Sequence, residues 1–381
     1  MKKNIKAAAA LLAAGVLALS ACGEDSASGG DGETIALSGF SILEAANEGI
    51  FEDFQSTDAG KDVTFEPSYG ASGDQSRAVV SGLAADVVHF SLEGDGVTFE
   101  PSYGASGDQS RAVVAGSPAD VVHYSLETDV TRLVGEGLVA EDWKDNATNG
   151  IATSSVVVFV VRKGNPDGIE SWDDLVEPGV DIITPNPGSS GSARWNILAA
   201  WAHATGGTDD EAAGKDFVTK LLNNVVALPG SGREATTAFT DGSGDVLLSY
   251  ENEAIIAKQN GADIDYVVPD DTLLIQNPAA VTKDAGPAAK SFLEFLTSDE
   301  AQADYASFGF RPVIDGVDVG EVEGANDPSD PFPAPGTLYT IDDNFGGWGE
   351  AADKFFGDGE EGNPLGIITE LQQQTGQVGE E

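Results

Sequence analysis

Short hydrophobic runs alternate with segments of helical spacing along most of the chain. Residues 34–40 form the first apolar run, and residues 43–54 then place apolar side chains three and four positions apart, as in an amphipathic helix. The same order recurs with strand character at residues 97–104, 119–126, 155–164, 180–186, 245–251 and 263–269, and helix character at 108–116, 128–138, 192–204 and 287–308. This order predicts an α/β protein with a largely parallel sheet covered by helices.

One block of this pattern occurs twice. The stretch VTFEPSYGASGDQSRAVV at residues 63–80 returns unchanged at 97–114. Repeat architectures need about three units to bury a core, so two near-identical copies indicate a recent duplication, or an error of sequence assembly, and no solenoid. The second copy runs directly into the predicted helix at 128–138, whereas the first ends in Gly-Asp-Gly and returns at once to a strand. Parallel strands need a crossover of ~10 or more residues. We therefore expect the second copy to lie in the sheet and the first copy to be expelled at the sheet edge. Because the two copies are almost identical in sequence, the opposite assignment stays open.

The first residues have the features of a secretion signal. Several lysines precede an apolar stretch that is too short to span a bilayer as a mature helix. The stretch ends in Leu-Ser-Ala-Cys-Gly, which resembles the lipobox of bacterial lipoproteins, and Cys22 is the single cysteine of the chain. We expect residues 1–22 to be a lipoprotein signal peptide with its lipobox, Cys22 to be lipidated, and residues 23–33 to be a flexible tether. The alternative is a chance cysteine beside an ordinary cleavage site.

Length and charge narrow the class of protein. The chain has 381 residues, and the roughly 350 that follow the signal exceed what one hydrophobic core usually serves, so we expect two lobes. Asp and Glu number 64 against 19 Lys and Arg, for a formal net charge of −45. This excess argues against nucleic acid or an anionic lipid surface as a partner, and its spread along the chain is typical of a solvated surface.

Three predicted strands end in small polar residues that open a helix. They are Tyr-Gly-Ala-Ser-Gly at Ser106, with its twin at Ser72, Pro-Gly-Ser-Ser-Gly-Ser at Ser190, and Pro-Gly-Ser-Gly-Arg at Gly232. Serine can cap exposed N–H groups, glycine allows close approach of the backbone, and the helix dipole adds positive potential. A single turn of this kind is most often simple capping. Three of them at the carboxyl ends of parallel strands predict an anion site.

Several motifs, in their order and spacing, resemble the sulfate-binding proteins of bacterial ABC transporters from residue 34 to about residue 371. They are SYGASGDQSRAV, VVFVVRKGNPDGIESWDDLVEPGV, ITPNPGSSGSARWNILAAW, GDVLLSYENEA and TIDDNFGGW. The resemblance implies a two-lobed type II periplasmic-binding-protein fold with a ligand cleft between the lobes. It also implies that sulfate is held by backbone N–H groups, a serine hydroxyl and an aromatic donor, without a direct salt bridge.

The resemblance implies a set of ligand-binding residues when its motifs are carried over. The set is Ser106 (or its twin Ser72), Ser190, Gly191, Ser192, Gly232 and Tyr250. Ser192 stands where some members have Gly, which leaves a backbone donor intact. Tyr250 stands where some have Trp, which moves the donor because a phenol and an indole donate from different points. Arg233 either stabilises the anion-binding turn through its charge without contacting the anion, or is an ordinary surface arginine.

The resemblance also divides the chain into lobes. Lobe 1 is residues 34–155 with about 272–325, including the duplicated block 63–96 and 97–130, and lobe 2 is 156–271 with about 336–381. We expect a monomeric receptor on the extracellular face of the membrane or in the periplasm that closes its lobes by hinge bending. Its partners would be sulfate, the permease subunits of an ABC transporter and, through lipidated Cys22, the membrane.

A site made of hydrogen-bond donors favours sulfate over phosphate. Sulfate is fully ionised near neutral pH and only accepts hydrogen bonds, whereas phosphate carries a proton, and a buried donor that faces a donor costs ~1–3 kcal/mol. No Asp or Glu stands directly against a Ser-Gly core, although Asp108 and Glu234 lie close in sequence. Thiosulfate, molybdate and phosphate stay open as ligands of the same fold. A secreted serine hydrolase that uses Ser106 or Ser190 is the alternative from another class.

We expect no metal, cofactor or catalytic activity. His89 and His123 are equivalent positions of the two copies and His203 follows an apolar helix, so no metal-ligand spacing results. Neither Ser-Gly cluster reads G-x-S-x-G. Asp327 and Asp330 provide too few oxygens for calcium. We expect hydrophobic-core positions for the tryptophans Trp172, Trp195, Trp201 and Trp348.

Overall fold

The computed structural model describes residues 35, 37–40, 44–57, 59–60, 64–65, 98–99, 102–359 and 363–378. These residues belong to one compact unit, Asp31–Glu381. The signal peptide, Cys22, the tether, Ser72 and His89 lie outside the described residues. Within the described part, no helix is both long and apolar enough to cross a membrane.

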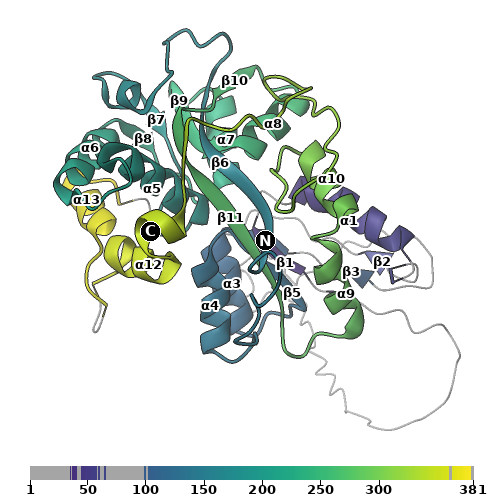
Figure 1. Cartoon of the computed structure of the whole chain (residues 1–381). Coiled ribbons are helices and arrows are strands. Elements are labelled where there is room, and N and C mark those ends of the chain that lie inside the picture. The colour runs from purple at the N-terminus through teal and green to yellow at the C-terminus, as the bar shows by residue number, and fades with distance from the viewer. Residues whose placement is uncertain are drawn as a thin grey trace, which may run out of the picture. The chain divides into compact units, whose positions relative to one another are not determined.

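A ten-stranded mixed sheet runs through the described chain in the order β4-β1-β5-β11-β6-β9-β7-β8, with β10 paired to β6 and β12 to β11. The strands are β1 (Leu37–Phe40), β4 (Ser102–Gly104), β5 (Val121–His123), β6 (Ile151–Arg162), β7 (Ile182–Ile183), β8 (Val225–Ala227), β9 (Val246–Tyr250), β10 (Ile264–Val267), β11 (Asp271–Val281) and β12 (Thr337–Tyr339). Strands β4, β1 and β5 form one parallel group, and β9, β7 and β8 form another. The antiparallel strands β11 and β6 join the two groups and run side by side through the centre of Figure 1.

Helices follow most of the parallel strands. They are α1 (Glu44–Ser56), α3 (Ser106–Val114), α4 (Glu127–Gly135), the 3-10 helix η2 (Trp172–Val176), α5 (Gly191–Thr205), α6 (Glu211–Asn223), α7 (Gly232–Thr240), α8 (Glu251–Gln259), α9 (Pro287–Phe295), α10 (Asp299–Ser307), α11 (Ile341–Phe345), α12 (Trp348–Phe356) and α13 (Ile367–Thr375). The predicted α/β class is confirmed.

Two details of the predicted pattern are wrong. The predicted helix at 287–308 is two helices, because the Ser298 hydroxyl accepts a hydrogen bond from the backbone N–H of Ala301 and starts α10 there. The sheet is mixed and not largely parallel, because β11 lies antiparallel to β5 and β6, and β6 lies antiparallel to β9 and β10. The run of β11 was not predicted, since Gln276, Asn277 and Pro278 interrupt its apolar pattern.

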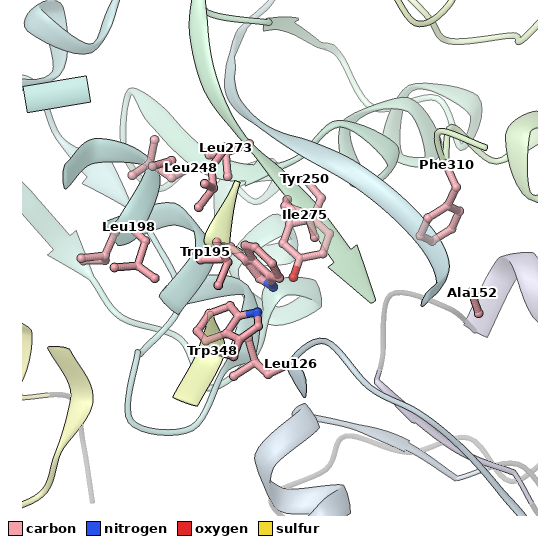
Figure 2. Close-up of a cluster of buried hydrophobic side chains, with 14 of the residues drawn as sticks. Leu126, Ala152, Trp195, Leu198, Leu248, Tyr250, Leu273, Ile275, Phe310 and Trp348 are labelled. Atoms are coloured by element: carbon pink, nitrogen blue, oxygen red, sulfur yellow. The ribbon is translucent and has the colours of Figure 1, made fainter. Parts of the chain in front are cut away.

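The hydrophobic core confirms the positions expected for the tryptophans. Trp172, Trp195, Trp201 and Trp348 are 1%, 0%, 3% and 5% exposed. Helix α5 is buried along almost its whole length because it contacts strands β9 and β11 and also helix α6. Trp195 on this helix packs edge-to-face on Trp348, with ring centroids 4.7 Å apart, in the cluster that Figure 2 shows.

The second copy of the duplicated block supplies β4, α3 and β5 of the main sheet. Of the first copy, the structure describes only β2 (Thr64–Phe65), which pairs in parallel with β3 (Thr98–Phe99) in a separate two-stranded sheet. The paired residues are thus equivalent positions of the two copies. Because Ser72 lies outside the described residues, the choice between Ser72 and Ser106 as ligand residue stays a prediction.

Candidate anion-binding site

The predicted anion turns lie where parallel strands lead into helices. Helix α3 begins at Ser106 after β4, α5 at Gly191 after β7, and α7 at Gly232 after β8. Strand β9 leads without a gap into α8, with Tyr250 as the residue before its first turn. Because the strands within each group are parallel, these helix N-termini collect at the carboxyl edge of their group, where ligands of α/β sheets bind.

Direct contacts bring the three predicted turns together. The Ser189 hydroxyl donates to the Gly230 carbonyl oxygen at 2.9 Å, and the Asn186 N–H donates to the Pro229 oxygen at 2.8 Å. A Cβ atom on Gly107 would lie 3.6 Å from the Ser189 oxygen. The turn before α5 therefore touches the other two turns.

Ser125, which was not predicted, connects several candidate residues. Its N–H donates to Ser106 Oγ at 3.0 Å, and its Oγ lies 2.7 Å from the Tyr250 hydroxyl. A Cβ atom on Gly191 would come within 2.5 Å of Ser125 Oγ. The indole N–H of Trp195 donates to the backbone carbonyl oxygen of Ser125 at 3.0 Å. The sequence did hold a signal for Ser125, because it stands between a strand and a helix start like the predicted serines.

Asp129 corrects the expectation that no carboxylate lies against a Ser-Gly core. The Ser106 hydroxyl donates to Asp129 Oδ2 at 2.5 Å, and Arg132 Nη1 donates to Asp129 Oδ1 at 2.9 Å. The expectation was wrong because α4 brings in a residue that is distant from Ser106 in sequence. Each oxygen of this buried side chain already accepts a hydrogen bond from the protein. The Ser106 proton points at Asp129, which leaves the backbone N–H of Ser106 as its donor to an anion.

The two carboxylates that are close in sequence make contacts of their own. Asp108 pairs with Arg111 one turn along α3. Glu234 is exposed, and its Oε2 accepts a hydrogen bond from the Gly230 N–H at 2.9 Å. Both side chains are therefore occupied within their own turn.

Several backbone N–H groups at these helix starts have no acceptor in the part of the chain that the structure describes. They include those of the four candidate residues Ser106, Gly191, Ser192 and Gly232. The first N–H groups of a helix have no partner within the helix and carry the positive end of its dipole. All four residues are buried, and an unsatisfied buried donor costs ~1–3 kcal/mol. The arrangement is therefore suited to an acceptor-only anion.

The serine hydroxyls differ in what they do. Ser231 caps α7 by accepting from the N–H of Glu234 at 3.2 Å. Ser190 caps no N–H, and its Oγ lies 3.3 Å from Ser192 Oγ. Its hydroxyl is thus not committed to the helix backbone. Among the described residues, neither Ser106 nor Ser190 contacts a histidine or lysine that could activate it, so nucleophilic chemistry has no general base here.

Tyr250 is fully buried and keeps its proton. Burial raises the pKa of its hydroxyl, and the hydrogen bonds with Ser125 and Asn277 only partly offset this. Asn277 lies at the irregularity in the pairing of β11 with β6. Its Nδ2 donates to the backbone carbonyl oxygen of Ser125 at 3.2 Å. Figure 2 shows the Tyr250 and Trp195 side chains close together, and both form a hydrogen bond with Ser125. A neutral phenol there is a hydrogen-bond donor near neutral pH.

Arg233 is part of a buried ion pair next to the first turn of α7. Its Nη2 lies 2.9 Å from Glu253 Oε1, although the pair is not aligned as a hydrogen bond. Thr236 also donates to this carboxylate, which is 1% exposed. The Arg233 side chain is 33% exposed, so its charge balances a buried carboxylate and is only partly open to solvent.

The described residues hold no group of three potential metal ligands. His123 is fully buried beside Thr153, and burial lowers its pKa to about 3. It is therefore neutral at physiological pH. Asp327 accepts hydrogen bonds from the N–H and hydroxyl of Ser329, as in an ordinary turn.

The chain is similar to known bacterial solute-binding proteins. Residues 89–311 match the family model described as bacterial extracellular solute-binding protein. A sulfate-binding protein of Synechococcus elongatus is 38% identical over 375 residues, which cover 94% of this chain and 95% of that protein. A thiosulfate-binding protein of Escherichia coli is 37% identical over 84% of this chain and 86% of its own length.

A solved structure agrees with these relatives. The sulfate-binding protein SubI from Mycobacterium tuberculosis H37Rv superposes with a TM-score of 0.71 at 41% identity, covering 85% of this chain and 99% of SubI. The predicted solute-binding-protein fold is thereby confirmed. The chain belongs to the family of bacterial extracellular solute-binding proteins that includes the sulfate-binding and thiosulfate-binding proteins.

Proposed function

We propose that this protein is an extracellular sulfate-binding receptor that delivers sulfate to an ABC permease. The observation that carries the proposal is the set of buried backbone N–H groups, at the starts of α3, α5 and α7, that have no acceptor among the described residues. Relatives named as sulfate-binding proteins support the same ligand. The ligand residues are Ser106, Ser190, Gly191, Ser192, Gly232 and Tyr250, with Ser72 as the alternative to Ser106.

The donor set selects sulfate by its protonation state. Sulfate offers only acceptors, and the four N–H groups with the Ser190 and Tyr250 hydroxyls offer donors. Protonated phosphate would need an acceptor, and the buried carboxylate of Asp129 already accepts from Ser106 and Arg132. Phosphate would therefore leave a donor facing a donor. Thiosulfate replaces one oxygen with a weaker sulfur acceptor and is the closest rival.

The donors come from both parallel groups of the sheet, which suggests binding by closure. Ser106 follows strand β4 of the first parallel group. Gly191 and Gly232 follow strands β7 and β8 of the second group. We assign residues 34–155 with about 272–325 to lobe 1 and 156–271 with about 336–381 to lobe 2. Bending of β6 and β11 between the lobes would complete the donor set around the anion.

The proposal includes attachment to the cell surface. We propose that Cys22 is lipidated and that residues 23–33 tether a monomeric receptor, without catalytic activity, to the outer face of the membrane. A Cys22→Ser variant should appear in the medium and not in the membrane fraction. Equal membrane retention of both proteins would contradict this part of the proposal.

Removal of one hydroxyl tests the site. Tyr250→Phe deletes the buried donor and leaves Ser125 Oγ without its 2.7 Å partner. We expect the variant to lose about 1.4 kcal/mol or more of binding free energy. This corresponds to a sulfate dissociation constant at least about tenfold higher, which calorimetry measures. Tyr339→Phe, on β12 outside the site, is the matched control and should bind as wild type. Wild-type affinity in Tyr250→Phe would place the anion elsewhere.

A further inference from the structure

A pocket lined by arginines lies beside the candidate site. It has a volume of about 500 Å³ and lies where α3 and α4 meet α5, α12 and α13. Arg111, Arg132 and Arg194 line it, which is half of the six arginines in the described part of the chain. The chain as a whole carries a formal charge of −45. Half of the described arginines thus cluster in one pocket of a strongly acidic protein.

Arg194 is the cation of this pocket that has no carboxylate of its own. Its Nε donates to the Pro187 oxygen at 3.0 Å, and its guanidinium lies over the Phe356 ring at 4.9 Å. Within the described ranges, no Asp or Glu oxygen is within ion-pairing distance of it. Burial lowers the pKa of Arg194, the charge of Asp129 raises it, and the positive charges of Arg132 and Arg111 lower it again. The charges of Arg111 and Arg132 thus both act on Arg194.

The other two arginines are only partly neutralised. Arg111 pairs with Asp108 and its side chain is 53% exposed, while Arg132 pairs with Asp129 and is 34% exposed. A guanidinium carries five N–H donors, and one ion pair uses only some of them. The carboxylates Asp353 and Asp358 also line the pocket. Donors from separate helices nevertheless remain available to a tetrahedral anion, which guanidinium groups bind well.

The pocket shares structure with the candidate site. Asn186, Pro187 and Gly188 line it, and the same turn continues into Ser189 and Ser190. The partner of Arg132 is Asp129, which holds the Ser106 hydroxyl. The pocket and the buried donors are therefore connected through the turn before α5 and through Asp129.

We propose that this three-arginine pocket is a staging site, where inorganic sulfate is captured before it passes to the buried donors. The inference rests on the proposed function and adds a second, weaker oxyanion site to it. The overall charge of the chain repels a dianion, and the guanidinium groups of the pocket, of which Arg194 has no ion-pair partner among the described residues, offset that repulsion at short range. The pocket should thus increase the association rate of sulfate and leave its dissociation rate almost unchanged.

Stopped-flow tryptophan fluorescence tests the inference, because Trp195 contacts Ser125 inside the candidate site. The series is Arg111→Glu, Arg111→Gln, wild type and Gln373→Arg, the last at an exposed residue that lines the pocket. At low ionic strength, each unit of positive charge should raise the association rate constant about threefold, while the dissociation rate constant changes less than twofold. The differences should shrink when salt screens the charges.

Lys290→Gln is the matched control, because Lys290 is exposed on α9 and does not line the pocket. It should bind sulfate at the wild-type rate. Equal association rates across the Arg111 and Gln373 series, or an equal effect of Lys290→Gln, would overturn the staging site and leave the receptor function intact. A wild-type protein that binds no sulfate in calorimetry would overturn both.

Discussion

Gly191 is the residue of the candidate site with the least room for change. A Cβ atom there would lie 2.5 Å from Ser125 Oγ and 2.7 Å from Ser125 Cβ, closer than such atoms pack. Three residues earlier in the same turn, a Cβ on Gly188 would meet its nearest neighbour, Asn186 Oδ1, at 3.4 Å. The two glycines of one turn therefore differ in what they tolerate.

Gly191→Ala should weaken sulfate binding, because overpacking of ~1–3 kcal/mol displaces either Ser125 or the start of α5. The expected rise in the dissociation constant is about tenfold or more, measured by calorimetry. Gly188→Ala should stay within about twofold of wild type, since ordinary contact costs little. Equal affinities of the two variants would show that the Gly191 N–H does not contact the anion.

His203 couples stability to pH at a place separate from the anion donors. Its Nδ1 lies 2.9 Å from Asp271 Oδ2, and its ring stacks on Trp172. Burial lowers the pKa of His203, but hydrogen bonding and charge from Asp271, with a contribution from Asp173, raise it above 6.5 overall. Its stabilising contribution is therefore complete below the pKa of the unfolded chain and is lost as the pH rises through the folded pKa.

The free energy of unfolding should reflect this linkage. The advantage of wild type over His203→Gln should be larger near pH 5.5 than near pH 8, as measured by urea unfolding. Sulfate affinity should be nearly flat from about pH 6 to 8, because the proposed donors and the ligand do not titrate there. The same stability difference at both pH values would contradict the assignment to His203.

At the scale of elements, helix starts carry the candidate site. The sequence indicated Ser106, Ser190, Gly191 and Gly232 correctly as helix-start residues, because strand, small polar turn and helix follow one another locally. It did not indicate Asp129, because that contact depends on how α4 packs beside α3. Local patterns thus predict which residues open a helix, while contacts between helices that follow different strands depend on packing.

The duplicated block gives an element-scale prediction. Deletion of residues 63–96 keeps β4, α3 and β5 and removes β2, whose described contact is the short pairing with β3. We expect unchanged sulfate binding and a higher melting temperature, because a shorter connection loses less entropy on folding. Calorimetry and thermal unfolding measure the two quantities.

Serine variants of the full-length chain serve as the control for the deletion. Ser106→Ala leaves Asp129 Oδ2 and the Ser125 N–H without their partner and should weaken binding. Ser72→Ala should have no effect. If only the Ser72 change weakens sulfate binding, the first copy forms the site.

At the scale of the whole molecule, two parallel strand groups joined by β6 and β11 carry the proposed donors at the helix starts that follow them. The class of fold was predictable from the alternation of strands and helices, whereas the antiparallel entry of β11 into the sheet was not, since its polar interior residues resemble a loop. The formal charge of −45 opposes anion binding at long range, so selectivity depends on local dipoles. The choice between sulfate and phosphate therefore depends on these dipoles.

Calorimetry of the wild-type protein with sulfate and phosphate at pH 7 tests that claim most directly. Sulfate should bind with a stoichiometry of about one in the buried site, and phosphate should bind at least about tenfold more weakly, because its proton meets a donor. Thiosulfate, measured in parallel, should fall between the two. Phosphate binding as tight as sulfate, or the absence of sulfate binding, would contradict the donor-only site.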